Sequence, residues 1–241
     1  YNTYENAADV HDLITTLGYQ HAELYGVSYG TRLAEEVMRA FPQDIESVVL
    51  DSTVTPSQNI ISDPLTTQAR DFNLLFQSCA ASATCNASYP NLGQVFYSLY
   101  AQLQTNPITF TGTDPDNSKT YPVLVNGDSL ASLLFQTLYV TPFIPHLPQM
   151  IYQIKQGNYA LLTQYANDFV FDTSVSYGMY TAVECGEDGA YTSDQIIEQN
   201  AQALAPAIRA DIIIGAEGQL AECANWHIAV EDAAQRTPVV S

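Results

Sequence analysis

The chain has 241 residues, of which 46% are hydrophobic, enough to bury the core of one large domain or of a domain with a big insertion. It carries 26 acidic and 7 basic residues, for a formal charge of −19. This balance argues against nucleic acid and anionic membranes as partners, because both require clustered Lys and Arg. The acidic residues form either a solvated surface or, in part, an attraction for a cationic substrate end.

A helix is predicted over residues 4–17, where apolar residues recur at helical spacing. Asn2, followed three residues later by Glu5, indicates its start. Gly18 indicates its end, because glycine commonly follows the last helical turn.

The next thirty residues predict a strand at 21–25, a helix at 31–41 and a second strand at 45–50. The second strand is almost entirely apolar at its end, as in a sheet covered on both faces. The order helix, strand, helix, strand predicts an α/β unit in which a helix connects two parallel strands.

From residue 54 to about 236 the sequence is rich in aromatic residues, and mostly helical structure is predicted there. A turn is predicted at 114–119 and a short strand at 121–125. Such a long run between two strands of a sheet is typical of a helical cap that excludes water and shapes a substrate pocket. The clearest predicted helices are 72–77, 92–103, 129–138, 147–155, 159–171 and 193–204.

The motif Gly26-Val27-Ser28-Tyr29-Gly30 lies between the first predicted strand and the helix that follows it. In this setting Ser28 is expected at the carboxyl end of the strand, as a nucleophile above the sheet. The backbone N–H of Tyr29 begins the helix and can donate to an oxyanion. Gly26 and Gly30 are expected to leave room where side chains would clash in the tight turn.

The partners of Ser28 are harder to find, since the usual order in this fold is serine, acid, then histidine. His146 lies inside the predicted cap and is expected to be a loop or packing residue. His227 is the only late histidine. Asp51 ends the second strand, where it would orient a histidine or, more commonly for an Asp there, bind a loop backbone. The sequence shows no metal signature and no nucleotide-binding loop, so we expect no metal and no cofactor.

The four cysteines have spacings that match neither a zinc ribbon nor a redox pair. Residues 79–85 predict a tight polar loop that a Cys79–Cys85 disulfide would close, and buried free thiols are the alternative. An even cysteine count, few lysines and a polar surface indicate a secreted or cell-envelope protein.

Five segments together resemble the tripeptidyl-aminopeptidase branch of the α/β-hydrolases, whose near relatives are the proline iminopeptidases. The resemblance is most specific in Leu17-Gly-Tyr-Gln-His-Ala-Glu-Leu-Tyr-Gly-Val-Ser-Tyr-Gly-Thr-Arg-Leu33, followed by Ala40-Phe-Pro and Ser47-Val-Val-Leu-Asp51. Met179-Tyr-Thr-Ala-Val-Glu-Cys-Gly-Glu187 resembles a motif of the cap, and Cys223-Ala-Asn-Trp226 resembles the Cys-x-x-Trp before the last catalytic strands.

This resemblance implies part of an α/β-hydrolase parallel sheet with a large, mostly helical cap insertion. The implied domains are 1–53 for the core with its nucleophile segment, 54–236 for the cap and 237–241 for the return to the core. The catalytic acid and histidine would follow the Cys-x-x-Trp segment, and an oxyanion loop would precede Tyr1. We therefore expect the chain to be an internal piece of a longer protein, inactive by itself.

The resemblance also assigns roles inside the cap. Enzymes of this branch act at a free peptide N-terminus, which is a cation, so Glu184 and Glu187 are expected to bind this ammonium group. Solvated surface carboxylates are the alternative. Cys185 is expected to pair with Cys223, which would tie the cap motif to the returning segment.

The expected function is that of a serine hydrolase, a peptidase that releases short peptides or residues from a free N-terminus through an acyl-enzyme. An esterase for small hydrophobic esters and a catalytically silent binding fragment are the alternatives. The expected partner is a peptide or small ester substrate. The strands at 21–25 and 45–50 would have unpaired neighbours, so self-association through exposed sheet edges is also expected.

Overall fold

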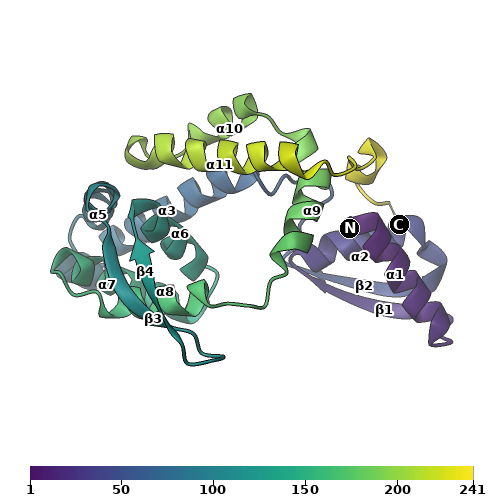
Figure 1. The fold of residues 1–241 in the computed structure, drawn as a ribbon, viewed down its shortest axis with the longest axis horizontal. Coiled ribbons are helices and arrows are strands. Elements are labelled where there is room, and N and C mark those ends of the chain that lie inside the picture. Colours follow the sequence, from purple (N-terminus) through teal and green to yellow (C-terminus); the bar gives the residue numbers. More distant parts are fainter. Residues whose placement is uncertain (241) are drawn as a thin grey trace. The chain divides into compact units, whose positions relative to one another are not determined.

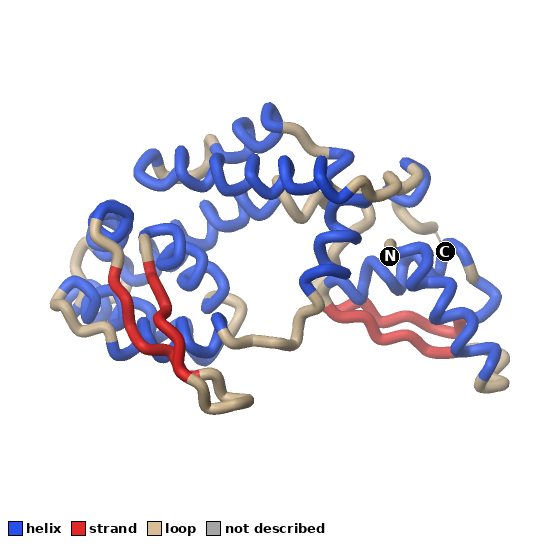
Figure 2. Tube along the Cα trace, in the orientation of Figure 1, coloured by secondary structure: helices blue, strands red, loops and turns tan. Residues whose placement is uncertain are grey.

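The computed structural model describes residues 1–240, and these form two compact units. The first unit comprises Tyr1–Asp63, Ser176–Ile196 and the chain from Glu217 onward, and the second comprises Pro64–Val175 and Ile197–Ala216. Each unit holds one pair of strands, drawn red in Figure 2. The domain limits at 53 and 236 stay predictions.

In the first unit, α1 (Thr3–Thr16) begins as the sequence predicts, because the Asn2 side chain accepts a hydrogen bond from the Glu5 N–H at 2.7 Å. Gly18 follows the helix with a φ of +79°, a conformation that glycine adopts without strain. The helix buries Ala7 and Ile14 and packs against the next helix in the chain (Figure 1).

Strand β1 (Ala22–Val27), helix α2 (Tyr29–Ala40) and strand β2 (Ile45–Asp51) form the expected α/β unit. The strands pair in parallel, with Leu24 opposite Val48. A short 3-10 turn (Pro42–Asp44) connects α2 to β2. This mixed helix-and-strand architecture is compatible with an α/β fold.

The prediction that this sheet is covered on both faces is wrong for the described residues. Helices α1 and α2 pack together, and α2 covers one face of the strands. On the other face Tyr25 and Val49 are 66% and 56% exposed. The apolar sequence of β2 is typical of a strand that is buried on both faces, but one face of β2 is exposed in this structure.

The second unit is a helical bundle with one antiparallel hairpin, β3 (Ile108–Thr113) and β4 (Thr120–Val125). Its core includes Phe72 and Phe96, whose rings meet edge to face at 5.3 Å. Its helices are α3 (Asp63–Ala81), α4 (Ala83–Ser88), α5 (Leu92–Thr105), α6 (Gly127–Thr137), α7 (Leu147–Lys155) and α8 (Ala160–Val170), with a 3-10 turn at Thr141–His146.

The segment 79–85 is not the predicted loop, because Cys79 lies in α3 and Cys85 in α4, and the disulfide joins the two helices. The remaining helices are α9 (Tyr177–Glu187), α10 (Asp194–Ala201) and α11 (Pro206–Trp226), with 3-10 turns at Gly189–Tyr191 and Ala233–Arg236. Within the described residues, no helix is both long and apolar enough to cross a membrane.

Candidate active site

Ser28 is the single residue between β1 and α2, and its backbone has a conformation that non-glycine residues rarely adopt. Its φ is 54° and its ψ is −124°. The Ser28 N–H donates to the carbonyl oxygen of Asp51 at 3.1 Å, and its own carbonyl accepts from the N–H of Thr31 at 3.0 Å. A non-glycine residue held in this region costs about 1–3 kcal/mol and persists only where neighbouring structure enforces it. A sharp strand-to-helix turn of this kind can expose a serine hydroxyl above a sheet, so Ser28 stays a candidate nucleophile.

The two glycines of the motif differ in their importance to the turn. A Cβ atom on Gly26 would lie 2.4 Å from the carbonyl oxygen of Gly30, a backbone contact that side chains do not tolerate. A Cβ atom on Gly30 would meet nothing within 4 Å among the described residues. The expectation of a clash is therefore confirmed for Gly26 and wrong for Gly30.

Tyr29 is the first residue of α2, so its N–H has no acceptor within the helix. The positive end of the helix dipole adds to the ability of this N–H to stabilise negative charge. The Tyr29 side chain is anchored by a 2.7 Å hydrogen bond between its hydroxyl and that of Thr3. Burial raises the pKa of this phenol, so the hydroxyl stays neutral. The oxyanion role of Tyr29 stays a prediction.

The three histidines of the first unit are engaged elsewhere. The His11 ring contacts the carboxylate of Asp44, while the Nδ1 atoms of His21 and His227 lie 3.0 and 2.8 Å from backbone carbonyl oxygens. In the described structure of this unit, none of the three forms a hydrogen bond with Ser28. His146 lies in a 3-10 turn of the second unit.

Asp51 does not orient a histidine in the described structure. Its carboxylate accepts hydrogen bonds from the hydroxyls of Tyr25 at 2.6 Å and of Ser52 at 3.2 Å. A compact triad of Ser28, Asp51 and His227 is therefore not formed.

Glu184 and Glu187, the two carboxylates of the cap motif, lie on α9 and are not solvated surface groups. Their exposed fractions are 2% and 0%. Glu187 accepts hydrogen bonds from the N–H and the hydroxyl of Thr3 at 2.5 and 2.7 Å. Glu184 accepts from the Gln219 amide at 2.5 Å and the Tyr180 hydroxyl at 3.3 Å. Burial raises the pKa of both carboxyl groups.

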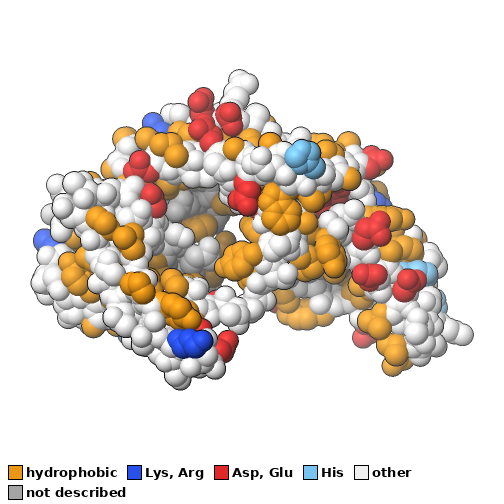
Figure 3. All heavy atoms as spheres, viewed as in Figure 1, with side chains coloured by type: hydrophobic (Ala, Val, Ile, Leu, Met, Phe, Trp, Pro, Cys, Tyr) orange, Lys and Arg blue, Asp and Glu red, His pale blue; other side chains and the backbone are white. Residues whose placement is uncertain are grey.

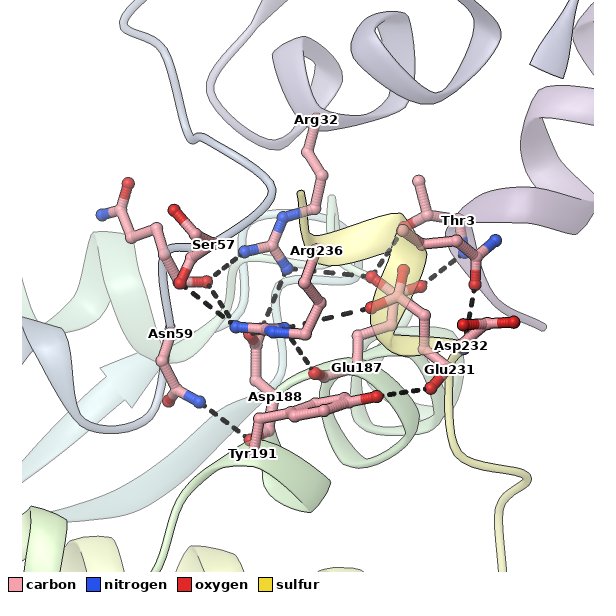
Figure 4. Close-up of polar contacts among 12 residues, drawn as sticks. Thr3, Arg32, Ser57, Asn59, Glu187, Asp188, Tyr191, Glu231, Asp232 and Arg236 are labelled. Carbon is pink, nitrogen blue, oxygen red and sulfur yellow. Dashed lines mark hydrogen bonds and ion pairs between the residues drawn. The ribbon is translucent and has the colours of Figure 1, made fainter. Parts of the chain in front are cut away.

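A buried ionic cluster surrounds Glu187, and Figure 4 shows its members. Asp188 lies between two guanidinium groups, 3.0 Å from Arg32 and 3.2 Å from Arg236. Arg32 lies 3.7 Å from Glu187, and Arg236 lies 3.9 Å from Glu231. The cluster holds three carboxylates and two cations, so it has one excess negative charge when all five groups are ionised. The sequence did not identify Arg32, Asp188, Glu231 or Arg236 as site residues, although Arg32 lies within the segment around Ser28 and Asp188 directly follows the cap motif.

Through this cluster the helix that begins beside Ser28 is fixed to other parts of the first unit. Arg32, one turn into α2, joins it to Asp188 at the end of α9 and contacts the carbonyl oxygen of Gln58. The Asn59 amide donates to the Asp188 carbonyl at 2.8 Å (Figure 4). The cluster therefore helps to hold the start of α2, which the candidate oxyanion site requires.

Both cysteine pairs fit disulfide bonding. Cys185 in α9 is bonded to Cys223 in α11, with Cα atoms 5.0 Å apart. The Cα atoms of Cys79 and Cys85 are 5.1 Å apart. Among the described residues no group of three or more His, Cys, Asp or Glu side chains could hold a metal ion.

Glu231 gives the cluster a pH dependence that can be measured. Burial, and then the charge of Glu187, raises the pKa of Glu231 from 4.5 to about 7. Between these values only the unfolded chain releases the proton, so the free energy of unfolding falls as pH rises, by roughly 3 kcal/mol at most from this group. Glu231→Gln should flatten the profile between pH 5 and 8 in urea titrations that follow the fluorescence of Trp226.

Glu46→Gln is the matched control, because Glu46 is exposed. A Glu231→Gln profile as steep as that of the Glu46→Gln protein would show that Glu231 does not titrate in this range.

Comparison with known proteins found no matching family model. The chain is 26% identical, over 243 aligned positions that cover 94% of it, to the serine protease Hip1 of Mycobacterium bovis and to that of Mycobacterium tuberculosis. This similarity supports a serine hydrolase. The chain spans 45% of the length of these relatives, or about half. The roles of Ser28 as a nucleophile and of the Tyr29 N–H as an oxyanion donor stay predictions.

Proposed function

We propose that this chain is part of a serine hydrolase in which Ser28 attacks a peptide carbonyl near the free N-terminus of a substrate. The observation that carries the proposal is the backbone of Ser28, held at φ 54° and ψ −124° between a strand and a helix. This geometry matches the exposed serine of a nucleophile elbow. The similarity to a serine protease supports the same class of chemistry.

In the proposed reaction the Ser28 Oγ forms a bond to the carbonyl carbon, and a base accepts its proton. The tetrahedral oxyanion receives a hydrogen bond from the N–H of Tyr29. The protonated base then passes the proton to the leaving amine, and water hydrolyses the acyl-enzyme in a second round. The histidines of the first unit contact other groups. The base is therefore expected to be a histidine from elsewhere in the longer protein, or one of these histidines after it leaves its present contact.

The preference for a free N-terminus draws support from buried negative charge in the first unit. Glu184 and Glu187 lie on α9, and the ionic cluster has one carboxylate in excess. Near neutral pH Glu231, with its pKa raised to about 7, is only partly ionised. A substrate ammonium group close to the cluster would favour its ionisation and would balance the resulting charge by charge-assisted hydrogen bonds. The two disulfides support a secreted or cell-envelope location, where such bonds persist.

A fluorophosphonate probe tests the nucleophile. In a longer protein that contains this chain, the probe should label Ser28, and Ser28→Ala should abolish the labelling detected by peptide mass spectrometry. Ser52→Ala is the matched control, because Ser52 is also exposed and also has a positive φ, of 58°. Labelling that persists in Ser28→Ala would refute the assignment.

The same protein distinguishes peptidase from esterase. A peptidase of the proposed kind should cleave a tripeptide p-nitroanilide with a free amino group and reject its N-acetylated form. Hydrolysis of p-nitrophenyl butyrate without cleavage of either peptide would favour an esterase.

A further inference from the structure

The hairpin of the second unit has an open edge on β3. The Thr113 N–H donates to the Asn167 side chain at 2.7 Å, and the Asn167 amide donates to the Thr113 carbonyl at 3.0 Å. Both backbone groups of Thr113 therefore point away from β4. In an antiparallel pair this orientation recurs at every second residue. The N–H and C=O groups of Thr111 and Thr109 thus lie on the same outer edge, and no described residue pairs with them.

The outer edge of β4 is closed in a different way. Pro122 is opposite Thr111 in the register, so its backbone nitrogen faces the outer edge of β4. Because proline has no N–H, this edge lacks a hydrogen-bond donor at that residue. Proline on an edge strand prevents another strand from pairing there. Asn167 occupies one position of the β3 edge much as a neighbouring peptide unit would. The positions at Thr111 and Thr109 have no such substitute.

A groove of about 460 Å³ lies between β3 and α8 beside this edge. Its lining includes Thr111, Gln164, Asn167 and Asp168, and Asp168 is its only charged residue. Figure 1 shows the hairpin with α8 next to it, and the side chains of Thr109 and Thr111 are exposed. An open strand edge beside a helix is a geometry that accepts an extended peptide as an added strand.

We propose that the β3 edge binds an extended peptide segment that carries a basic residue. The peptide adds as a strand, exchanges hydrogen bonds with the backbone of Thr111 and Thr109, and places a Lys or Arg near Asp168. Charge selects this occupant, because the chain carries −19 and the groove presents a carboxylate. A second copy of the chain would bring two like-charged edges together, which is unfavourable.

The probe is the unlabelled, N-acetylated, C-amidated peptide Lys-Val-Thr-Val-Thr-Val-Lys, whose binding is followed by isothermal titration calorimetry at low salt. Acetylation keeps this measurement independent of cleavage at a free N-terminus. Thr111→Pro removes the outward N–H and should weaken binding by about tenfold or more. Thr111→Val keeps that N–H and should bind as the parent does. Pro122 occupies the equivalent position of β4, so Thr111→Pro should fold, which circular dichroism checks.

Two further measurements separate strand addition from general attraction. A peptide N-methylated at alternate residues on its pairing edge should lose binding, and Asp168→Asn should weaken binding and reduce its salt dependence. The proposal is overturned if the parent peptide does not bind at 1 mM, if Thr111→Pro and Thr111→Val bind equally, or if the N-methylated peptide binds unchanged. A dimer in sedimentation that Thr111→Pro dissociates would overturn it in favour of a second copy.

Discussion

The 241-residue chain alone is expected to hydrolyse esters and peptides no faster than its own Ser28→Ala variant. A serine hydroxyl is a poor nucleophile without a base, and none of the histidines of the first unit forms a hydrogen bond with it in the described structure. Loss of a triad member lowers turnover by about four to six powers of ten. Loss of one oxyanion donor costs about two to three powers of ten, and these losses do not simply add.

The measurement compares the purified chain with Ser28→Ala on p-nitrophenyl butyrate and on a tripeptide p-nitroanilide. A longer protein that contains the chain serves as the positive control. Serine-dependent turnover by the chain alone, abolished by His227→Ala, would instead establish His227 as the base and require it to move from its contact with the Asn225 carbonyl.

Arg32→Met is expected to destabilise the first unit by about 3–5 kcal/mol, because it removes one cation from the buried ionic cluster. Arg32 is 4% exposed, and it contacts Asp188 at 3.0 Å. The substitution leaves Asp188 with Arg236 alone and leaves Glu187 without its nearby cation. Uncompensated buried charge, more than the lost attraction, causes the effect. Urea denaturation followed by the fluorescence of Trp226, the single tryptophan, reports on this unit.

Arg70→Met provides the control for a surface ion pair, since the Arg70 side chain is 68% exposed and pairs with its neighbour Asp71 at 2.9 Å. Because Arg70 lies in the second unit and Trp226 in the first, the unfolding of both variants is also followed by circular dichroism. An exposed pair of this kind contributes about 0–1 kcal/mol. Similar losses of stability in the two variants would show that the buried cluster contributes no more than a surface ion pair.

The local sequence predicted those elements whose signals are local. The Asn2 cap and the apolar spacing gave α1, and the glycine-flanked serine gave the turn before α2. By contrast, α11 was missed because its apolar residues follow no clear stripe. Strand β3 was also missed, although Thr109, Thr111 and Thr113 alternate with inward-facing residues at the spacing of a strand.

The ionic cluster could not be predicted in the same way. Its charges come from residues 32, 187–188, 231 and 236, which only the folded chain brings together. Single charged residues on a sequence more commonly indicate a solvated surface. The sequence therefore identified Glu187 as a candidate site residue but not the neighbouring cations that determine its environment.

The backbone of Ser28 also places a limit on how stable this protein can become. Replacement of Ser28 by glycine would release conformational strain, yet it would remove the hydroxyl on which the proposed chemistry depends. Selection for stability alone would therefore favour loss of the serine at this turn. A serine at this turn is therefore a compromise, in which a small energetic penalty accompanies the hydroxyl that the proposed chemistry requires.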